Sequence, residues 1–387
     1  MILAVNPGSA SRKFAIYDGD KRLFFAHIET EKGKYLLNLE VDGGKETQEI
    51  SETDYKNDVE FILNMAKVRG AISGKAEISG IGVRIVAPGE YFYSHNPIDA
   101  EFEQKLAEAE EEAPLHIRPI REELQKLDSA MPSVKKIAVS DSAFHAGLPA
   151  HARVYAIPKE VAQKYNIYRF GYHGISIQSV IKKIPALTGS LPERVIVCHL
   201  GSGASITAVR AGKSVDTSMG FTPLEGLPMG TRVGDLDPGV LLYLGGKLGM
   251  DYRQMEEYLN NQAGFLGISG KTADVRELLE LESKGDPDAA LAIKIFVYKI
   301  QKYIGAYAAA MGGVDLVVFT ATIGERSVVM RERIAHGLEF LGIALDSLKN
   351  TSPGGDALIG NKLAIIATDE LGEIARETAA ALNIITS

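Results

Sequence analysis

The sequence predicts an α/β protein with layered architecture, built from two related domains. Three observations lead to this prediction. An apolar run, a Gly/Ser-rich turn and a second apolar run occur together near the start of each half, at residues 2–18 and 194–209. Stretches of helix-forming composition lie between these two patterns. Strands mixed with helices of this length favour helices layered on sheets.

The repeated pattern predicts β-hairpins with polar tips. In the first, Ile2–Val5 is followed by NPGSASRK and then by FAIYD. In the second, Arg194–Cys198 is followed by HLGSGAS and then by ITAV. A weaker third version begins at Leu316–Phe319 and continues as TATIGERS. Each Gly/Ser turn between apolar runs favours strand, turn and strand.

Four helices are expected between and after the hairpins. Residues 101–112 and 120–127 have helical composition, and Pro114 breaks the first of these helices. Residues 288–311 form a long amphipathic candidate that ends at two glycines. Residues 369–382 form a terminal helix, for which Thr368 is a plausible N-cap.

A domain boundary is expected near residues 145–155, around GLPAHAR. We therefore expect an N-terminal lobe over residues 1–148 and a C-terminal lobe over residues 149–369. The C-terminal helix, about 370–387, is expected to pack back onto the first lobe.

The composition is that of an ordinary soluble globular protein. The 387 residues are 45% hydrophobic and 24% charged, with a net charge of −8 and no basic block suited to nucleic acid. No apolar run approaches the ~18 residues of a membrane span, and the N-terminus does not resemble a signal peptide. The single cysteine, Cys198, excludes an internal disulfide, and its apolar neighbours favour a buried strand residue over a nucleophile. We expect a cytoplasmic protein.

The segment from Lys213 to Val240 is the most informative part of the chain. It is long, punctuated by Gly and Pro, and rich in Asp, Thr and Ser. Loops of this length in compact domains are usually functional or disordered, and its Met, Phe and Leu content argues against disorder. We expect an ordered loop that presents Arg232 at a site.

Other polar groups indicate anion binding. Ser9, Ser11 and Lys13 could hold a phosphate at the first Gly/Ser tip, although a plain hairpin turn has the same composition. Arg84 lies inside an apolar stretch, where a buried arginine needs an anionic partner. His173 lies between two glycines, which suggests a constrained turn presenting the imidazole; a structural histidine would fit equally well.

Two acids suit a divalent cation. Asp141 follows the apolar Ile137–Val139, where it could bind Mg²⁺ or cap a helix. Glu370 in ATDEL has the same ambiguity, because acids are common in a first helical turn. GISGKT at residues 267–272 resembles the end of a P-loop, but Phe265 occupies a position that requires glycine. Arginines, acids and Gly/Ser tips together suit phosphoryl transfer.

Together these segments resemble the acetate kinase family. The resemblance runs almost end to end, with all blocks in the family's order, and residues 216–237 are its most specific part. The blocks are NPGSASRK, APLH, DSAFH, RFGYHGIS, HLGSGASITAV, KSVDTSMGFTPLEGLPMGTRVGDLDP, IGERS, GLEFLGI and IARET.

The resemblance implies a two-lobed, duplicated actin-like ATPase (ribonuclease H-like) fold, with nucleotide and substrate in the interdomain cleft. It also implies a homodimer with a role in acetyl-CoA biosynthesis. The implied reaction is reversible transfer of the γ-phosphoryl group of ATP to acetate, giving acetyl phosphate and ADP, with Mg²⁺ or Mn²⁺.

The resemblance also implies residue roles. Arg84 and Arg232 would neutralise the acetate carboxylate and the transferring phosphoryl group, which His173 would stabilise in flight. Asp141 would serve the metal and orient acetate. Acetate is already ionised at neutral pH, so no general base is needed. The implied metal ligands are Asn6 and Glu370. The implied phosphate and nucleotide contacts are Ser9, Ser11, Lys13, His199, Gly201, Ser202, Gly203, Asp274, Arg276, Ala321, Thr322, Ile323 and Gly324. Val86, Leu115, Tyr172 and Pro223 would line a small methyl pocket, with His116 close to the phosphoryl group.

The chain departs from the family at several positions. The family's HRVVHGGE is VRIVAPGE here, its Asn in the second phosphate loop is Ser202, and Ile117-Arg118 follows APLH in place of Asn-Pro. FTGGIGEN appears as FTATIGER, so Ala321 and Thr322 replace two glycines and Arg326 replaces an asparagine. Side chains at the glycine positions could crowd a base or ribose.

These departures leave alternatives open. Pyrophosphate or another nucleotide could be the phosphoryl donor, and propionate could be the acceptor. From a different class, the chain could be a non-catalytic nucleotide-binding protein, because one fold serves many functions. Butyrate kinases share the NPGS opening, but the DTSMGFTPLEGLPMGTR block resembles acetate kinases instead.

Overall fold

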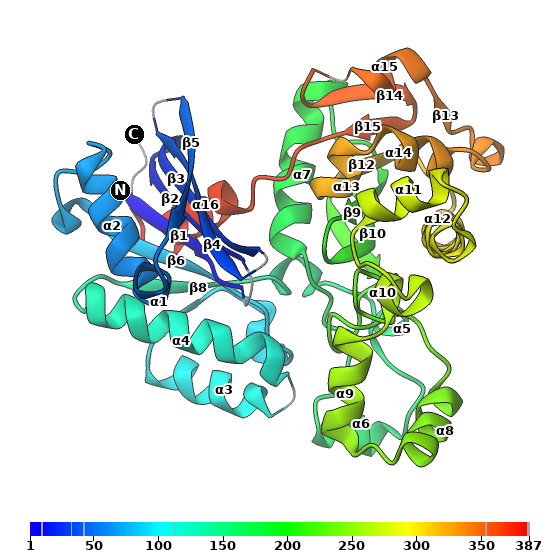
Figure 1. Ribbon diagram of the computed structural model, residues 1–387, viewed down its shortest axis with the longest axis horizontal. Coiled ribbons are helices and arrows are strands. Elements are labelled where there is room, and N and C mark those ends of the chain that lie inside the picture. The colour runs from blue at the N-terminus through cyan, green and yellow to red at the C-terminus, as the bar shows by residue number, and fades with distance from the viewer. Residues whose placement is uncertain (9–10, 32, 42, 112, 353, 385–387) are drawn as a thin grey trace. The chain divides into compact units, whose positions relative to one another are not determined.

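The computed structural model describes residues 1–384 apart from 9–10, 32, 42, 112 and 353 (Figure 1). It divides into two compact units. Unit 1 consists of Met1–Ala143 and Asp369–Ser387, and unit 2 is Phe144–Thr368. The chain therefore leaves unit 1 a few residues before the boundary expected from the sequence, and returns to it after Thr368.

Unit 1 contains an eight-stranded mixed sheet in the order β5-β4-β3-β2-β1-β6-β8-β7. At its centre, β1 pairs antiparallel with β2 and parallel with β6, and β6 pairs parallel with β8. The strands are β1 Ile2–Asn6, β2 Ser11–Asp18, β3 Lys21–Glu31, β4 Lys34–Val41, β5 Gly44–Ile50, β6 Gly80–Ile85, β7 Asn96–Pro97 and β8 Lys136–Ser140.

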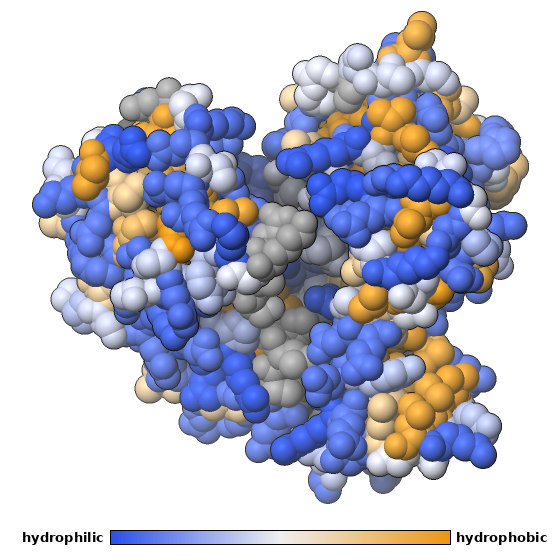
Figure 2. Space-filling model, viewed as in Figure 1, coloured by the Kyte–Doolittle hydropathy of each residue, from blue (hydrophilic) through white to orange (hydrophobic). Residues whose placement is uncertain are grey.

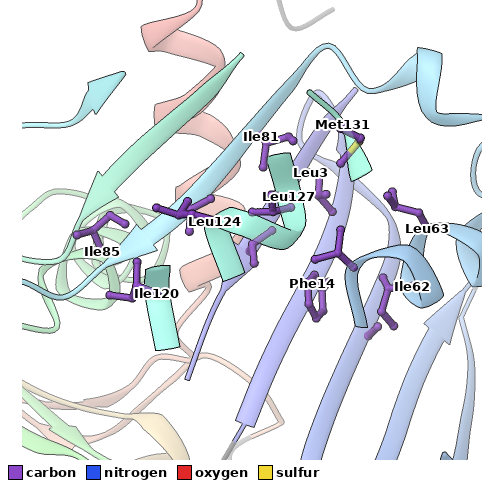
Figure 3. Packing of buried hydrophobic residues seen from close by; sticks show 14 of the residues in the cluster. Leu3, Phe14, Ile62, Leu63, Ile81, Ile85, Ile120, Leu124, Leu127 and Met131 are labelled. Atoms are coloured by element: carbon purple, nitrogen blue, oxygen red, sulfur yellow. The ribbon is translucent and has the colours of Figure 1, made fainter. Parts of the chain in front are cut away.

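Helices cover both faces of this sheet. Figure 3 shows the core on one face, where Ile62 and Leu63 of α2 and Leu124 and Leu127 of α4 pack with Leu3 and other strand residues. The helix α16 packs against β1, β6 and β8 within the same unit. The helices of unit 1 are α1 Glu52–Lys56, α2 Asp58–Val68, α3 Ala100–Glu110, α4 Pro114–Ala130 and α16 Glu370–Ala381.

Unit 2 contains a seven-stranded mixed sheet in the order β11-β10-β9-β12-β15-β14-β13. Its central strand β9 pairs antiparallel with β10 and parallel with β12, and β12 pairs parallel with β15. The strands are β9 Arg194–Leu200, β10 Ala204–Arg210, β11 Lys213–Thr217, β12 Leu316–Thr320, β13 Ala344–Leu345, β14 Ala357–Asn361 and β15 Leu363–Ile365.

Two long helices flank the strands β9 and β10, with α7 on one side and α12 on the other (Figure 1). The helix α12 begins at Pro287, directly after the cap Asp286, and ends where Gly312 adopts a left-handed conformation. The helices of unit 2 are α5 Ala150–Arg153, α6 Lys159–Lys164, α7 Gly174–Thr188, α8 Pro238–Leu248, α9 Tyr252–Asn261, α10 Gly264–Ser269, α11 Val275–Ser283, α12 Pro287–Met311, α13 Ala321–Arg326, α14 Val328–Ala335 and α15 Ser347–Thr351.

The two sheets repeat one topology. The order β3-β2-β1-β6-β8 in unit 1 corresponds to β11-β10-β9-β12-β15 in unit 2, with antiparallel pairing on one side of the central strand and parallel pairing on the other. This repeat confirms the two hairpins predicted from the sequence, β1–β2 and β9–β10. In the described part of the chain, none of the helices combines the length and apolar character needed to span a bilayer.

Two local predictions were wrong, and one helix starts earlier than expected. The third expected hairpin is instead the strand β12 followed directly by the helix α13. Pro114 ends the first helical stretch as expected, but it is also the first residue of α4, because proline suits the first helical turn; the helix expected at 120–127 therefore begins earlier. Thr368 does not cap α16: the side chain of Asp369 accepts from the backbone N–H of Gly372 at 3.1 Å and fills that role.

Candidate functional site

Three side chains of unit 1 lie where neighbouring parallel strands end. Asn6 is the last residue of β1, Arg84 is next to last in β6, and Asp141 follows β8. The backbone N–H of Asp141 donates to the carbonyl of Ile85 at 2.9 Å, which holds the two strand ends together. The carboxyl ends of parallel strands are the usual place for ligands in α/β sheets.

Hydrogen bonds join these residues into one group, here called the unit 1 cluster: Asn6, Arg84, Asp141 and Glu370. Arg84 Nη2 donates to Asp141 Oδ2 at 2.7 Å, and its Nη1 donates to Asn6 Oδ1 at 3.3 Å. Asn6 Nδ2 in turn donates to Glu370 Oε2 at 2.9 Å. Burial opposes the charge of Arg84, but the Asp141 and Glu370 carboxylates outweigh it and raise the pKa of the guanidinium. The cluster thus combines a permanent cation with two carboxylates.

Glu370 reaches this cluster because α16 lies close to β6. A methyl group added to Gly82 would come within 2.0 Å of Thr378 Oγ1 and 2.7 Å of Ile374 Cγ2. Only glycine leaves room for that approach. The strand sequence GIG therefore helps to place the first residue of α16 beside Asn6.

The β1–β2 tip is only partly described. Ser9 lies outside the described residues. Ser11 Oγ and His27 Nε2 are 2.6 Å apart, and Lys13 lies opposite His27 in the strand pairing. Burial, followed by the charge of Lys13, lowers the pKa of His27 to about 4. His27 was missed in the sequence, because no local pattern indicates a cross-strand partner.

The residues expected in the methyl pocket are divided between the units. Val86 packs against the unit 1 core. Leu115 and His116 lie in the first turn of α4, and their side chains are outside the described part of the structure. Tyr172 and Pro223 belong to unit 2, where the Tyr172 hydroxyl donates to the carbonyl of Phe221 at 2.7 Å.

In unit 2, His173 occupies a strained turn before α7. Its φ of 62° lies in the left-handed region, which is uncommon for a residue other than glycine. His173 Nδ1 and Ser205 Oγ of β10 are 2.9 Å apart. Strain of this kind persists where the surroundings hold the residue in place, and it often marks a functional position.

His199 of β9 stacks on His173. The ring centroids are 4.0 Å apart with an angle of 21° between the planes. His199 Nδ1 and Ser176 Oγ of α7 are 2.8 Å apart, so each imidazole has a buried serine at its Nδ1. Ser176 and Ser205 were not singled out in the sequence.

The Nε2 atoms of these imidazoles lie near the β9–β10 tip. A methyl group on Gly203 would come within 3.0 Å of His173 Nε2 and 3.8 Å of Arg232 Nη1. One on Gly201 would lie 3.8 Å from His199 Nε2 and 3.5 Å from Ala321 Cβ. Ser202 lies between these two glycines. Two imidazoles and a guanidinium therefore converge on a Gly-Ser-Gly backbone, an arrangement suited to a phosphoryl group.

The loop that carries Arg232 is ordered by its own core and by a half-buried ion pair. Met219, Leu227 and Met229 are fully or almost fully buried. Arg169 Nη2 binds Glu225 Oε1 at 2.5 Å. Arg232 is half-buried, and its Nη1 donates to the carbonyl of Pro223 at 3.4 Å. The expectation of an ordered loop is confirmed.

The strand β12 leads into a turn, residues 320–326, called the α13 turn. Ala321 has a φ of 64°, a conformation that glycine adopts at lower cost. Glu325 Oε1 accepts from the backbone N–H of Ala321 at 2.8 Å and holds the turn closed. Thr322 is exposed, Ile323 is half-buried and Gly324 is buried. Glu325 was another residue that the sequence did not single out.

Asp274 and Arg276 begin α11. Asp274 caps the helix by accepting from the backbone N–H of Arg276 at 2.7 Å, and it pairs with the exposed Arg276 guanidinium at 2.5 Å. The side-chain hydrogen bond from Arg276 lowers the pKa of Asp274, against the effect of its partial burial. Gly230 lies against Ala273, so the Arg232 loop runs beside this helix start.

Two candidates set aside in the sequence have structural roles. Lys271, from the P-loop-like segment, pairs with Asp286 at the start of α12. Cys198 is fully buried, and burial raises the pKa of its thiol. Among the described residues, no three His, Cys, Asp or Glu side chains are grouped to hold a metal ion by themselves.

Comparisons with known proteins agree with this geometry. The model of the acetokinase family matches residues 1–376. An acetate kinase of Desulforamulus reducens is 40% identical over 392 residues, covering 98% of this chain and 99% of the relative.

Solved structures give the same result. The acetate kinase of Porphyromonas gingivalis superposes with a TM-score of 0.86 at 35% identity, covering 98% of this chain and 99% of that chain. A propionate kinase of Francisella tularensis gives a TM-score of 0.90 at 35% identity, covering 99% of both chains. These similarities and the repeated sheet topology confirm the two-lobed α/β fold of the actin-like ATPase type. The family model and the relatives both extend over almost the whole chain, and the protein therefore belongs to the acetokinase family.

Proposed function

We propose that this protein is an acetate kinase, which transfers the γ-phosphoryl group of ATP reversibly to acetate and forms acetyl phosphate and ADP. Membership of the acetokinase family makes it a phosphotransferase with a carboxyl group as acceptor. The observation that carries the assignment is the convergence of His173, His199 and Arg232 on the Gly201–Gly203 backbone. These groups can stabilise charge on the equatorial oxygens of a phosphoryl group during in-line displacement.

We assign acetate and the metal ion to the unit 1 cluster. Arg84 carries a charge fixed by two carboxylates, so its guanidinium can also orient a small carboxylate. Asn6, Asp141 and Glu370 offer the oxygen ligands that Mg²⁺ or Mn²⁺ accepts. Mg²⁺ usually takes only one or two protein carboxylates, with water and substrate phosphates completing its shell, so this donor set fits the ion. When bound, the ion would neutralise charge on the phosphates.

We assign the nucleotide to unit 2. The β9–β10 tip and the α13 turn are neighbours, because Gly201 lies close to Ala321. Backbone N–H groups at such turns suit phosphates, and the exposed Arg276 adds a cation. Ile323 and Gly324 would approach the adenosine. In unit 1, Ser11 and Lys13 would add phosphate contacts.

Propionate as acceptor, and GTP or pyrophosphate as donor, are alternatives that the activity test distinguishes. The Francisella tularensis relative is a propionate kinase, and one methylene alters pocket binding by only about 1–3 kcal/mol. Thr322 and Arg326 at the α13 turn motivate tests of GTP and pyrophosphate as donors.

We also propose a cytoplasmic homodimer that uses α8 as a contact surface. No residue of α8 is buried in the chain, although several of its residues are apolar. Leu242 and Tyr243 are 81% and 64% exposed. Figure 2 shows apolar surface over this region. An exposed apolar patch of this kind suits a protein partner. Sedimentation of the wild type and of L242D would show a dimer that the substitution weakens.

The test of the catalytic proposal is the initial rate of acyl phosphate formation. Purified protein with Mg²⁺ is given acetate or propionate, and ATP, GTP or pyrophosphate as donor. We expect acetyl phosphate with ATP as the best donor. Activity only with another donor would assign that compound as the phosphoryl donor. If no pair of donor and acceptor gave a product, the proposal that the protein is a carboxylate kinase would be refuted.

A further inference from the structure

The imidazole of His199 is the inner end of a chain of two hydroxyl groups, those of Thr368 and Ser176. Thr368 Oγ1 donates to Ser176 Oγ at 2.8 Å, and Ser176 Oγ lies 2.8 Å from His199 Nδ1. Ser176 is fully buried and His199 is 7% exposed, so water does not compete for the bond between them, whereas Thr368 is half-buried. All three residues belong to unit 2.

The direction of these bonds selects one form of the imidazole. A hydroxyl that accepts from Thr368 still has its own proton to donate. Ser176 can give that proton to His199 Nδ1, which must then be unprotonated in the neutral ring. In that arrangement the ring proton is on Nε2, the atom that lies near Gly201.

The position of Thr368 is itself fixed by the α13 turn. Its backbone N–H donates to Glu325 Oε1 at 3.1 Å. The same oxygen accepts from the backbone N–H of Ala321 at 2.8 Å. One carboxylate oxygen therefore fixes both the left-handed turn and the start of the hydroxyl chain.

We propose that Ser176 and Thr368 are positioning residues that hold His199 with its proton on Nε2, ready to donate to a phosphate oxygen at the β9–β10 tip. Thr368, Ser176 and His199 form a hydrogen-bond relay, which Glu325 connects to the α13 turn. The hydrogen bond from His199 Nε2 to a phosphate oxygen rests on the proposed function, whereas the tautomer of His199 does not.

The first test is the tautomer of His199 in the resting protein. Histidine labelled with ¹⁵N reports which ring nitrogen carries the proton, and H199N identifies the signal. We expect a protonated Nε2 in the wild type, and a mixture of tautomers or the Nδ1–H form in S176A and T368V. T368S keeps the hydroxyl and should restore the wild-type signal.

The second test is kinetic and uses a matched control. Loss of a bond that orients a functional imidazole should lower kcat about 10-fold to 100-fold in S176A and T368V, with the KM for acetate within about 2-fold. T368S should recover most of kcat. T207V removes another buried hydroxyl pair, 3.1 Å from Thr207 Oγ1 to Thr217 Oγ1, and should leave kcat and the His199 signal unchanged.

A wild-type tautomer and a wild-type kcat in both S176A and T368V would refute the relay. Nδ1–H as the main form in the wild type would refute it as well. If the wild type has no carboxylate kinase activity, the proposed function fails, but the ¹⁵N signals still decide whether the relay sets the tautomer.

Discussion

The β1–β2 and β9–β10 hairpins hold equivalent places in their sheets but lead to different chemistry. Beside β1, the parallel strands end in a charged group, where Arg84 binds Asp141 and contacts Asn6. Beside β9, the polar groups are two stacked imidazoles, each with a serine hydroxyl. A repeated backbone thus supplies an ion-paired site suited to a carboxylate and a metal ion, and a site of directed hydrogen-bond donors suited to a phosphoryl group.

The half-buried Arg84 of unit 1 and the buried Arg331 of unit 2 also differ in their charge environments. Arg84 is paired with a carboxylate, and its pKa is raised. Arg331 of unit 2 is surrounded by neutral acceptors: Nε donates to Asn350 Oδ1 at 2.6 Å, and Nη1 donates to the carbonyls of Gly324 and Glu325 at 2.9 Å. Burial lowers the pKa of Arg331. Arg331 therefore supports the α13 turn, whereas Arg84 has the charge environment of a ligand-binding group.

The largest effect is expected for R84A. It removes the cation that holds the unit 1 cluster together, so kcat/KM for acetate should fall by about 10³-fold or more. Steady-state kinetics with saturating ATP measures the loss. R194Q removes an arginine–carboxylate pair of similar geometry, 2.6 Å to Asp315, away from the cluster, and should retain activity. Equal losses in both variants would contradict a special role for Arg84.

The next effect is expected for H173N. Asparagine tolerates the left-handed conformation of His173, so the fold should be retained while kcat falls by about 10²-fold to 10³-fold. Thermal unfolding separates the two effects. H336N changes a 90% exposed histidine and serves as the control. Unchanged kcat in H173N would remove the imidazole from the mechanism.

Glu123 makes the stability of unit 1 depend on pH. It is 1% exposed, Lys126 binds its Oε2 at 3.3 Å, and its Oε1 has no hydrogen-bond partner in the described part of the chain. Burial, followed by the charge of Asp58, raises its pKa to about 7. A carboxyl group whose pKa is raised in the folded state stabilises the fold below its unfolded pKa of 4.5, and this contribution is lost as pH rises to about 7.

E123Q should therefore gain stability relative to the wild type between pH 5 and 8, by up to about 3 kcal/mol at the upper end. Urea unfolding across this range measures the difference. E103Q changes an exposed carboxylate of α3 and should show no such trend. A constant difference between E123Q and the wild type at all pH values would contradict the raised pKa.

The smallest effect concerns the α13 turn. Thr322 is exposed beside the left-handed Ala321, where the family has glycines. If its side chain crowds the nucleotide, T322G should lower the KM for ATP about 3-fold to 10-fold, with little change in the KM for acetate. Titration of ATP at saturating acetate measures this. An unchanged KM for ATP would place Thr322 outside the nucleotide site.

Local patterns predicted the framework well. Both hairpins and the long helix ending at Gly312 follow from apolar runs bounded by Gly, Ser or Pro. The third hairpin failed because the residues after β12 can close a helical turn, which Glu325 stabilises through the N–H of Ala321. The sequence around Leu316–Phe319 does not distinguish these outcomes.

Long-range pairs account for most of what the sequence did not predict. Ser176 and Thr368 are 192 positions apart, and Asn6 and Glu370 are 364 positions apart. Thr368 looked like a helix cap because its neighbours are helical, but Asp369 lies one residue closer to Gly372 and takes the bond. Glu370 could be assigned only through the family resemblance, whereas its contact with Asn6 required the folded chain.

The most direct test of the division between the units is the affinity of R84A for ADP, measured by calorimetry beside its turnover. Arg84 is assigned to the acetate side and the nucleotide to unit 2. R84A should therefore bind ADP within about 3-fold of the wild type while its turnover collapses. A loss of ADP affinity as large as the loss of turnover would contradict this division.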